Sequence, residues 1–128
     1  MKIEFDDNYF MSKAIDEAKI ALSKGEVPIG AVIVADNKII ARAHNMVEAL
    51  NDVTAHAEIL AITSASNYIG GKYLENCSIY VTLEPCQMCA GALYWSRISK
   101  IYFGAEDPKR GCLLYTSDAA DEWPGVGV

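Results

Sequence analysis

Two short clusters in this chain hold residue types that can bind a metal ion and move protons. The first is His56-Ala57-Glu58, and the second is Pro85-Cys86-Gln87-Met88-Cys89. Imidazole and thiolate are ligands that zinc prefers in tetrahedral sites. The clusters use one of only two His and two of only four Cys in the chain. This pattern predicts a zinc site with a carboxyl group beside it.

The spacing of the thiols suits a shared metal ion. Cys86 and Cys89 are three residues apart, so they share one face at the start of a predicted helix. The N-terminus of a helix favours the thiolate that a metal requires. A Cys-x-x-Cys motif alone is also compatible with a redox-active or structural role. With His56 there are three protein ligands, which leave one coordination position open, as in catalytic zinc sites, where a bound water has its pKa lowered toward neutrality.

Glu58 is predicted to carry protons rather than to bind the metal. It follows His56 by two residues, which on a helix separates the side chains by roughly 200°. A closed structural site requires a fourth protein ligand, for which Cys77, His44 and Cys112 are the candidates. Cys77 precedes a predicted strand and fits a small core residue better. His44 ends a strand and fits a core or surface histidine, and Cys112 belongs to the divergent tail described below.

The elements that position these residues follow from apolar periodicity and turn residues. Their order is α-β-β-α-β-α-β, which predicts an α/β fold with helices packed on a sheet and parallel strands where a helix intervenes. The predicted helices cover about residues 8–24, 55–66 and 86–95, and the predicted strands cover residues 29–35, 38–44, 78–83 and 100–104.

Length and composition indicate one globular domain. The chain has 128 residues, of which 52% are apolar and 22% are charged. No apolar run approaches the roughly 20 residues that cross a bilayer, and the acidic residues near Met1 do not fit a signal peptide. We therefore expect a cytoplasmic protein without a membrane partner. The net charge of −6 argues against broad binding to nucleic acid but leaves room for a local nucleotide site.

With these motifs, the chain resembles the zinc-dependent cytidine deaminase superfamily, whose established signature is His-x-Glu followed by Pro-Cys-x-x-Cys. Within it, the chain is most similar to the bacterial tRNA adenosine deaminases, over about residues 8–111. The matching segments are residues 27–32, 51–58, 81–92 and 103–109. The resemblance implies a three-layer α-β-α fold with a mixed central sheet.

The resemblance also implies an activity and a set of roles. The expected reaction is hydrolytic deamination of the wobble adenosine in a tRNA anticodon arm, which gives inosine and ammonia. Glu58 would shuttle the protons. Asn45 would hydrogen-bond the base, and Asp107 would contact the sugar-phosphate backbone near it. The residues that would hold one zinc ion per subunit are His56, Cys86 and Cys89. A homodimer is the expected assembly.

Two alternatives remain at this point. One is a free-base deaminase such as guanine deaminase, which shares the fold and the zinc motif. The other is a catalytically silent zinc-binding subunit that only pairs with a partner chain. The amino-acid sequences of residues 81–86 and 103–109 favour the tRNA enzyme over the free-base enzyme. The presence of Glu58 argues against the silent subunit.

The last part of the chain departs from the family pattern. We expect a deaminase domain over residues 1–111 and a non-native tail over residues 112–128, with the C-terminal elements of the fold missing. Residues 112–122 match a reading frame through a common transposase sequencing adapter. The tail carries three acidic residues and no basic residue, so residues 1–111 have a net charge of −3. On this interpretation Cys112 is not a metal ligand.

Overall fold

The computed structural model describes residues 4–105 and the backbone of residues 126 and 127. The helices are α1 (Asp7–Ser23), α2 (Val47–Leu50), α3 (Ala57–Ile69) and α4 (Gln87–Ser96). The strands are β1 (Gly30–Ala35), β2 (Lys38–His44), β3 (Cys77–Val81), β4 (Lys100–Phe103) and β5 (Val126–Gly127). They form one mixed sheet in the order β2-β1-β3-β4-β5, in which β1 is antiparallel to β2 and β3, and β4 is parallel to β3 and β5.

Local sequence signals set the first elements. The Asp6 carboxylate accepts a hydrogen bond from the Tyr9 amide at 2.9 Å and caps the start of α1. Just after α1, Gly25 has a φ of 77°, a left-handed conformation that glycine adopts at little cost. Asp36 and Asn37 join β1 to β2 with φ values of 50° and 60°. Positive φ at both central residues is typical of the turn that suits a tight hairpin.

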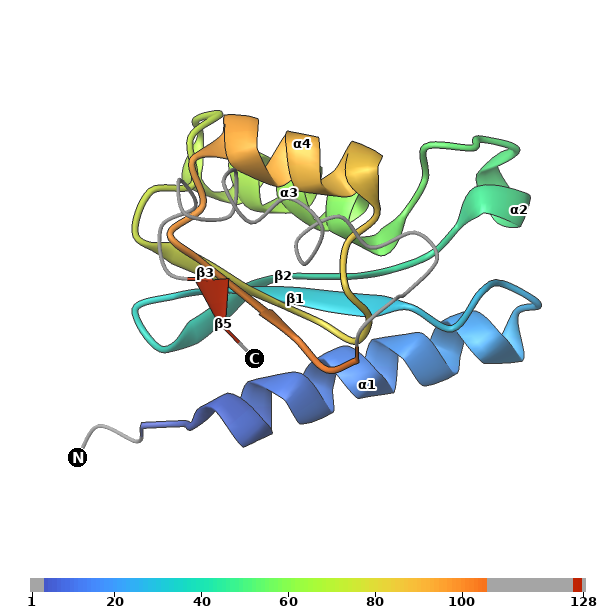
Figure 1. The fold of residues 1–128 in the computed structure, drawn as a ribbon, viewed down its shortest axis with the longest axis horizontal. Coiled ribbons are helices and arrows are strands. Elements are labelled where there is room, and N and C mark those ends of the chain that lie inside the picture. The colour runs from blue at the N-terminus through green and yellow to red at the C-terminus, as the bar shows by residue number, and fades with distance from the viewer. Residues whose placement is uncertain (1–3, 106–125, 128) are drawn as a thin grey trace.

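The sheet lies between two helical layers. Helix α1 covers one face, and α3 and α4 cover the other (Figure 1). Alternate residues of β1 therefore face different cores: Ile33 packs toward α3 and α4, whereas Val32 packs toward α1 and Phe10. Gly30 allows the close approach of α1, because a Cβ at this position would lie 2.1 Å from the Ala14 carbonyl oxygen.

Strand direction brings the two chemical clusters together. Strands β2 and β3 are both antiparallel to β1, so they run the same way and their carboxyl ends meet at one edge of the sheet. The register confirms this, since Gly30 pairs with His44 and the adjacent Ala31 pairs with Val81. The chain leaves β2 toward α3 and leaves β3 toward α4. The N-termini of α3 and α4 consequently converge above this edge.

The predicted α/β fold and its element order are confirmed, with differences in detail. The predicted helix over 55–66 begins later, at Ala57, and ends at Ile69. Helix α2 was not predicted, because four residues are too few to show a helical period. Strand β5 is an addition to the predicted order. The predicted domain boundary after residue 111 lies outside the described residues and stays a prediction. None of the helices in the described part of the chain has the length and apolarity to cross a membrane.

Candidate metal centre

The structure brings His56, Cys86 and Cys89 into one group. The Nδ1 atom of His56 lies 3.6 Å from the Cys86 sulfur and 3.5 Å from the Cys89 sulfur. All three potential ligand atoms lie within 4.8 Å of one another. A tetrahedral zinc ion with bonds of about 2.3 Å to sulfur and about 2.0 Å to nitrogen places these atoms about 3.5 Å apart. The spacing of the three side chains therefore fits zinc.

Helix termini present all three side chains. His56 is the N-cap of α3 and has an extended backbone, with φ −81° and ψ 154°. Its imidazole does not cap the helix, which leaves the ring free for a metal. Cys86 is the N-cap of α4, and Cys89 lies in the first turn of that helix. Both sulfur atoms therefore belong to the N-terminal end of α4, where the helix dipole favours a thiolate.

The two thiols differ in their readiness to ionise. The hydrogen bond from Cys89 is the largest influence on Cys86, whose pKa falls to about 5, and nearby His56 adds to the effect. The same hydrogen bond, together with burial, raises the pKa of Cys89. Cys86 is therefore the first of the two thiols to lose its proton, and Cys89 is the second. Binding of a metal to both sulfur atoms would release the second proton.

Glu58 lies beside this group without belonging to it. Its side chain is 3% exposed, and burial raises its pKa to about 7. Its Oε1 atom is buried and has no hydrogen-bond partner among the described residues. Such an unsatisfied oxygen is costly in a core, and functional sites are where it is tolerated. A carboxyl group that titrates near neutrality can both accept and return a proton.

His56 and Glu58 do not lie together within one helix, contrary to the expectation from the sequence. His56 precedes α3 rather than opening it, so the rotation of roughly 200° expected of two residues on one helix does not describe this pair. Tertiary placement decides the matter instead. Glu58 is the second residue of α3, and it is not a member of the group of atoms spaced for a metal. Its role as a proton carrier rather than a ligand stays a prediction.

Asn45 both caps helix α3 and lines a cavity, a combination that the sequence did not predict. It is 4% exposed, and its Oδ1 accepts a hydrogen bond from the Ala57 amide at 2.8 Å. Asn45 thereby caps α3, a task that His56 leaves open. Asn45 also lines the cavity described below. Asp107, the other predicted substrate contact, lies outside the described residues.

A cavity of about 630 Å³ opens onto the metal group. His56, Glu58 and Cys86 line its metal end, and Glu26 and Asn45 line its sides. This volume is within the range of about 300 to 1,000 Å³ that is common for small-ligand sites. Sequence reasoning missed Glu26 as a lining residue. Its position just before the matching segment at residues 27–32 was the available signal.

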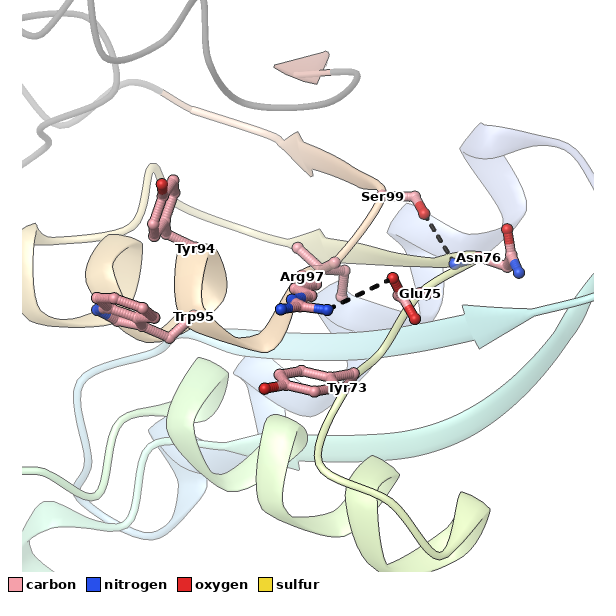
Figure 2. Close-up of a pocket in the computed structure, with 8 residues that line it drawn as sticks. Tyr73, Glu75, Asn76, Tyr94, Trp95, Arg97 and Ser99 are labelled. Atoms are coloured by element: carbon pink, nitrogen blue, oxygen red, sulfur yellow. Dashed lines mark hydrogen bonds and ion pairs between the residues drawn. The ribbon is translucent and has the colours of Figure 1, made fainter.

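A second cavity of about 560 Å³ lies at the opposite end of α4. Figure 2 shows the Arg97 guanidinium over the Tyr73 ring, at 4.0 Å from the ring centroid, and paired with Glu75 at 4.0 Å. Tyr94 and Trp95 project from α4 beside it. Within the described residues, the group spaced for a metal belongs to the first cavity. The first cavity is therefore the candidate site for metal-dependent chemistry.

The layered α/β fold and the His-Cys-Cys group beside a buried carboxyl define a zinc-dependent deaminase domain. The sequence pattern of one family, described as "Cytidine and deoxycytidylate deaminase zinc-binding region", matches residues 5–105. The chain belongs to this family. Zinc is accordingly its metal, and nucleobase deamination is its class of reaction.

The curated relatives that this chain matches include tRNA-specific adenosine deaminases. The chain is 54% identical over 114 residues to the tRNA-specific adenosine deaminase of Aquifex aeolicus, covering 89% of this chain and 76% of the relative. It is 56% identical over 106 residues to the tRNA-specific adenosine deaminase of Bacillus subtilis, covering 83% and 66%. The chain thus spans about two thirds to three quarters of the length of these relatives.

Solved structures agree with the fold. One, described as "Biochemical and Structural Studies of A-to-I Editing by tRNA:A34 Deaminases at the Wobble Position of Transfer RNA", superposes with a TM-score of 0.87 at 45% identity, covering 93% of this chain and 90% of the other. The guanine deaminase of Bacillus subtilis superposes with a TM-score of 0.78 at 38% identity, covering 92% and 70%. Both the similarity in sequence and the fit in structure are greater for the first.

Proposed function

We propose that this chain deaminates the wobble adenosine of a tRNA anticodon arm to inosine. The observation that carries the proposal is the buried Glu58 carboxyl, with its unpartnered oxygen, beside the His56, Cys86 and Cys89 group in one cavity. The similarity to enzymes named tRNA-specific adenosine deaminases supports adenosine in tRNA as the substrate.

Each residue of the centre has a defined part in this reaction. His56, Cys86 and Cys89 would hold the zinc ion, which when bound would lower the pKa of water toward neutrality. Glu58 accepts one proton from the attacking water and delivers it to the ring nitrogen, and then accepts the remaining hydroxyl proton and delivers it to the departing amino group. The bond from carbon to the exocyclic nitrogen breaks, and a bond from the same carbon to the water oxygen forms. Water is consumed and ammonia leaves.

Base recognition completes the proposal. Asn45 donates its amide N–H group to the target base, since its Oδ1 is occupied by the Ala57 amide. Asp107 contacts the sugar-phosphate backbone next to that base. A base pulled out of its stack is required for access to a buried centre, which fits a single-stranded anticodon loop.

The test compares three substrates with the zinc-loaded chain. The substrates are an anticodon stem-loop with adenosine at the wobble position, the same stem-loop with guanosine there, and free guanine. Inosine is measured by chromatography of the digested RNA, and ammonia is measured by a coupled assay. We expect ammonia and inosine from the first substrate alone. Ammonia from free guanine alone would identify the free-base deaminase, and no reaction with any substrate would favour the silent subunit.

We further propose that the chain forms a homodimer through the exposed side of α4. Ala90 and Leu93 of this helix are 2% and 0% exposed and belong to the core, whereas Tyr94 and Trp95 are 46% and 76% exposed. Figure 2 shows both of these rings projecting from the helix. Exposed aromatic side chains grouped at one place favour a protein interface over open solvent.

Solution mass tests the assembly. Light scattering coupled to gel filtration should give twice the chain mass of 14.0 kDa. Trp95→Lys should shift the chain toward the monomer. Leu22→Lys, at a position that is 62% exposed on the opposite helical layer, is the matched control and should leave the mass unchanged. A monomeric wild-type chain would refute the dimer.

Two further expectations complete the proposal. We propose that residues 1–111 form the deaminase domain and that residues 112–128 are adapter-derived. Amplification of the gene from source DNA tests this, and an unchanged C-terminal sequence would contradict it. We also propose a cytoplasmic location, where tRNA is the available substrate, and cell fractionation with an antibody against the chain is the corresponding test.

A further inference from the structure

The segment over residues 45–56 forms one side of the metal cavity. It joins β2 to α3, and its ends are the two site residues Asn45 and His56. Backbone hydrogen bonds close it at its base, since the Met46 amide donates to the Ala55 carbonyl at 2.9 Å. In its middle lies α2, which Figure 1 shows apart from the helical layers. The cavity is lined from this segment by Val47, Glu48 and Val53 among others.

Helix α2 has little to stabilise it locally. It spans the four residues Val47–Leu50, none of which is buried, and isolated helices of this length do not persist in water. Its N-cap, Met46, offers no side-chain hydrogen bond. The conformation of the segment must therefore be held from elsewhere in the fold.

Glu26 provides that support. Its Oε1 accepts a hydrogen bond from the Glu48 amide at 3.0 Å, and its Oε2 accepts one from the Ala49 amide at 2.8 Å. These amides are the second and third of α2, which have no partner within so short a helix. The Glu26 side chain is 5% exposed whereas Glu48 and Ala49 are exposed, so the two bonds are partly shielded from water. Hydrogen bonds to a carboxylate are about twice as strong as neutral ones.

Glu26 is itself held by the first helix. Its own amide donates to the Ala21 carbonyl at 3.0 Å, just beyond the end of α1, and Ala21 is fully buried. The long helix α1 packs against the sheet through Gly30. Rigid structure on one side of the cavity is thus connected through one carboxylate to the segment that carries Asn45 and His56.

We infer that Glu26 is a positioning residue, which sets the cavity wall for the substrate base by fixing α2, whereas His56 is held separately at the start of α3, where its carbonyl accepts from the Leu60 amide. This inference rests on the proposed deaminase function and deepens it. Glu26 acts through α2, and its removal should loosen the wall while the zinc ligands and Glu58 stay in place. The expected consequence is weaker substrate binding with little change in the chemical step.

Glu26→Gln tests the inference, because glutamine keeps the size of the side chain but turns an NH₂ group toward one of the two amide donors. We expect the KM for the anticodon stem-loop to rise about tenfold, on the scale of one lost hydrogen bond to a charged group. The kcat and the zinc content should stay within about twofold of wild type. Glu75→Gln makes the same change at an exposed carboxylate remote from this cavity and should alter neither constant.

Hydrogen exchange measures the proposed hydrogen bonds directly, without turnover, and can be applied to the wild-type chain. In the wild-type chain, the Glu48 and Ala49 amides should exchange at least about tenfold more slowly than free amides, and Glu26→Gln should remove that protection. If Glu26→Gln does not fold, Glu26→Asp replaces it in this test. The shorter aspartate side chain reaches fewer donors and should give partial protection of the two amides. Free exchange in wild type, or an unchanged KM in folded Glu26→Gln, would overturn the inference. A wild-type chain that is inactive on the stem-loop but keeps these amides protected would instead refute the proposed function.

Discussion

Glu58→Gln should stabilise the metal-free chain above neutral pH while it abolishes deamination. In the folded chain, burial raises the pKa of Glu58 from 4.5 to about 7. The unfolded chain therefore loses this proton more readily than the folded chain does. Folding carries no such penalty below pH 4.5, where both states are protonated, and carries the full penalty above pH 7, where both are ionised.

The size of the effect follows from the shift. One pKa unit corresponds to about 1.4 kcal/mol, so a rise from 4.5 to about 7 corresponds to about 3 kcal/mol. Glutamine has the same shape and no charge to desolvate. The free energy of unfolding of the variant should therefore exceed that of wild type by about 3 kcal/mol above pH 7, and this excess should decline to near zero below pH 4.5.

The assay is urea unfolding at a series of pH values, with a chelator to remove metal and a reductant to protect the thiols. Glu75→Gln serves as the control, since its carboxylate side chain is 64% exposed and should show no comparable pH dependence. Saturating zinc should reduce the difference between Glu58→Gln and wild type, because a divalent cation favours the nearby carboxylate. A difference that does not change with pH would refute the assignment of a buried, high-pKa carboxyl, and an active variant would refute its role in proton transfer.

Three further predictions concern the metal and the packing. Cys89→Ser should lower bound zinc, measured by mass spectrometry of the metal, from one per chain to near zero. Gly30→Ala should lower the free energy of unfolding in urea by about 3 kcal/mol, because the added Cβ would lie 2.1 Å from the Ala14 carbonyl oxygen. Gly91→Ala is the control, because its Cβ would meet nothing within 4 Å. This change within α4 should be neutral or stabilise the fold by up to about 1 kcal/mol. Leu93→Ala, at a fully buried position, should cost about 2 to 5 kcal/mol in the same assay, and a smaller loss would show that the core collapses around it.

Much of the fold could be predicted from local patterns. The turn at Asp36-Asn37 and the helix end at Gly25 depend on backbone preferences that a few residues determine. Apolar periodicity located α1, β1 and β3 to within a residue or two. Helix α2 escaped prediction because its four residues are too few to show a helical period, and two of its amides donate to Glu26 from another part of the chain. Such support leaves no trace in the sequence of the helix itself.

The candidate site, like the fold, could be predicted from the sequence only in part. The candidate ligands could be predicted from the sequence, because few side chains bind zinc and this chain places His56, Cys86 and Cys89 in a recognisable order. Their convergence within 4.8 Å required the strand directions of the sheet. The sequence also placed His56 on its helix, whereas the structure places it just before the helix.

By itself, the sequence determined the kinds of chemistry available to this protein and the order of its elements. Residue types carry ligand preferences and backbone preferences wherever they occur, so both can be read without a fold. The tertiary structure alone decided that Glu58 is buried with an unpartnered oxygen, that Asn45 caps α3, and that Glu26 supports α2. Burial, pKa and long-range hydrogen bonds depend on which distant residues cover a group, and only the folded chain brings those residues together.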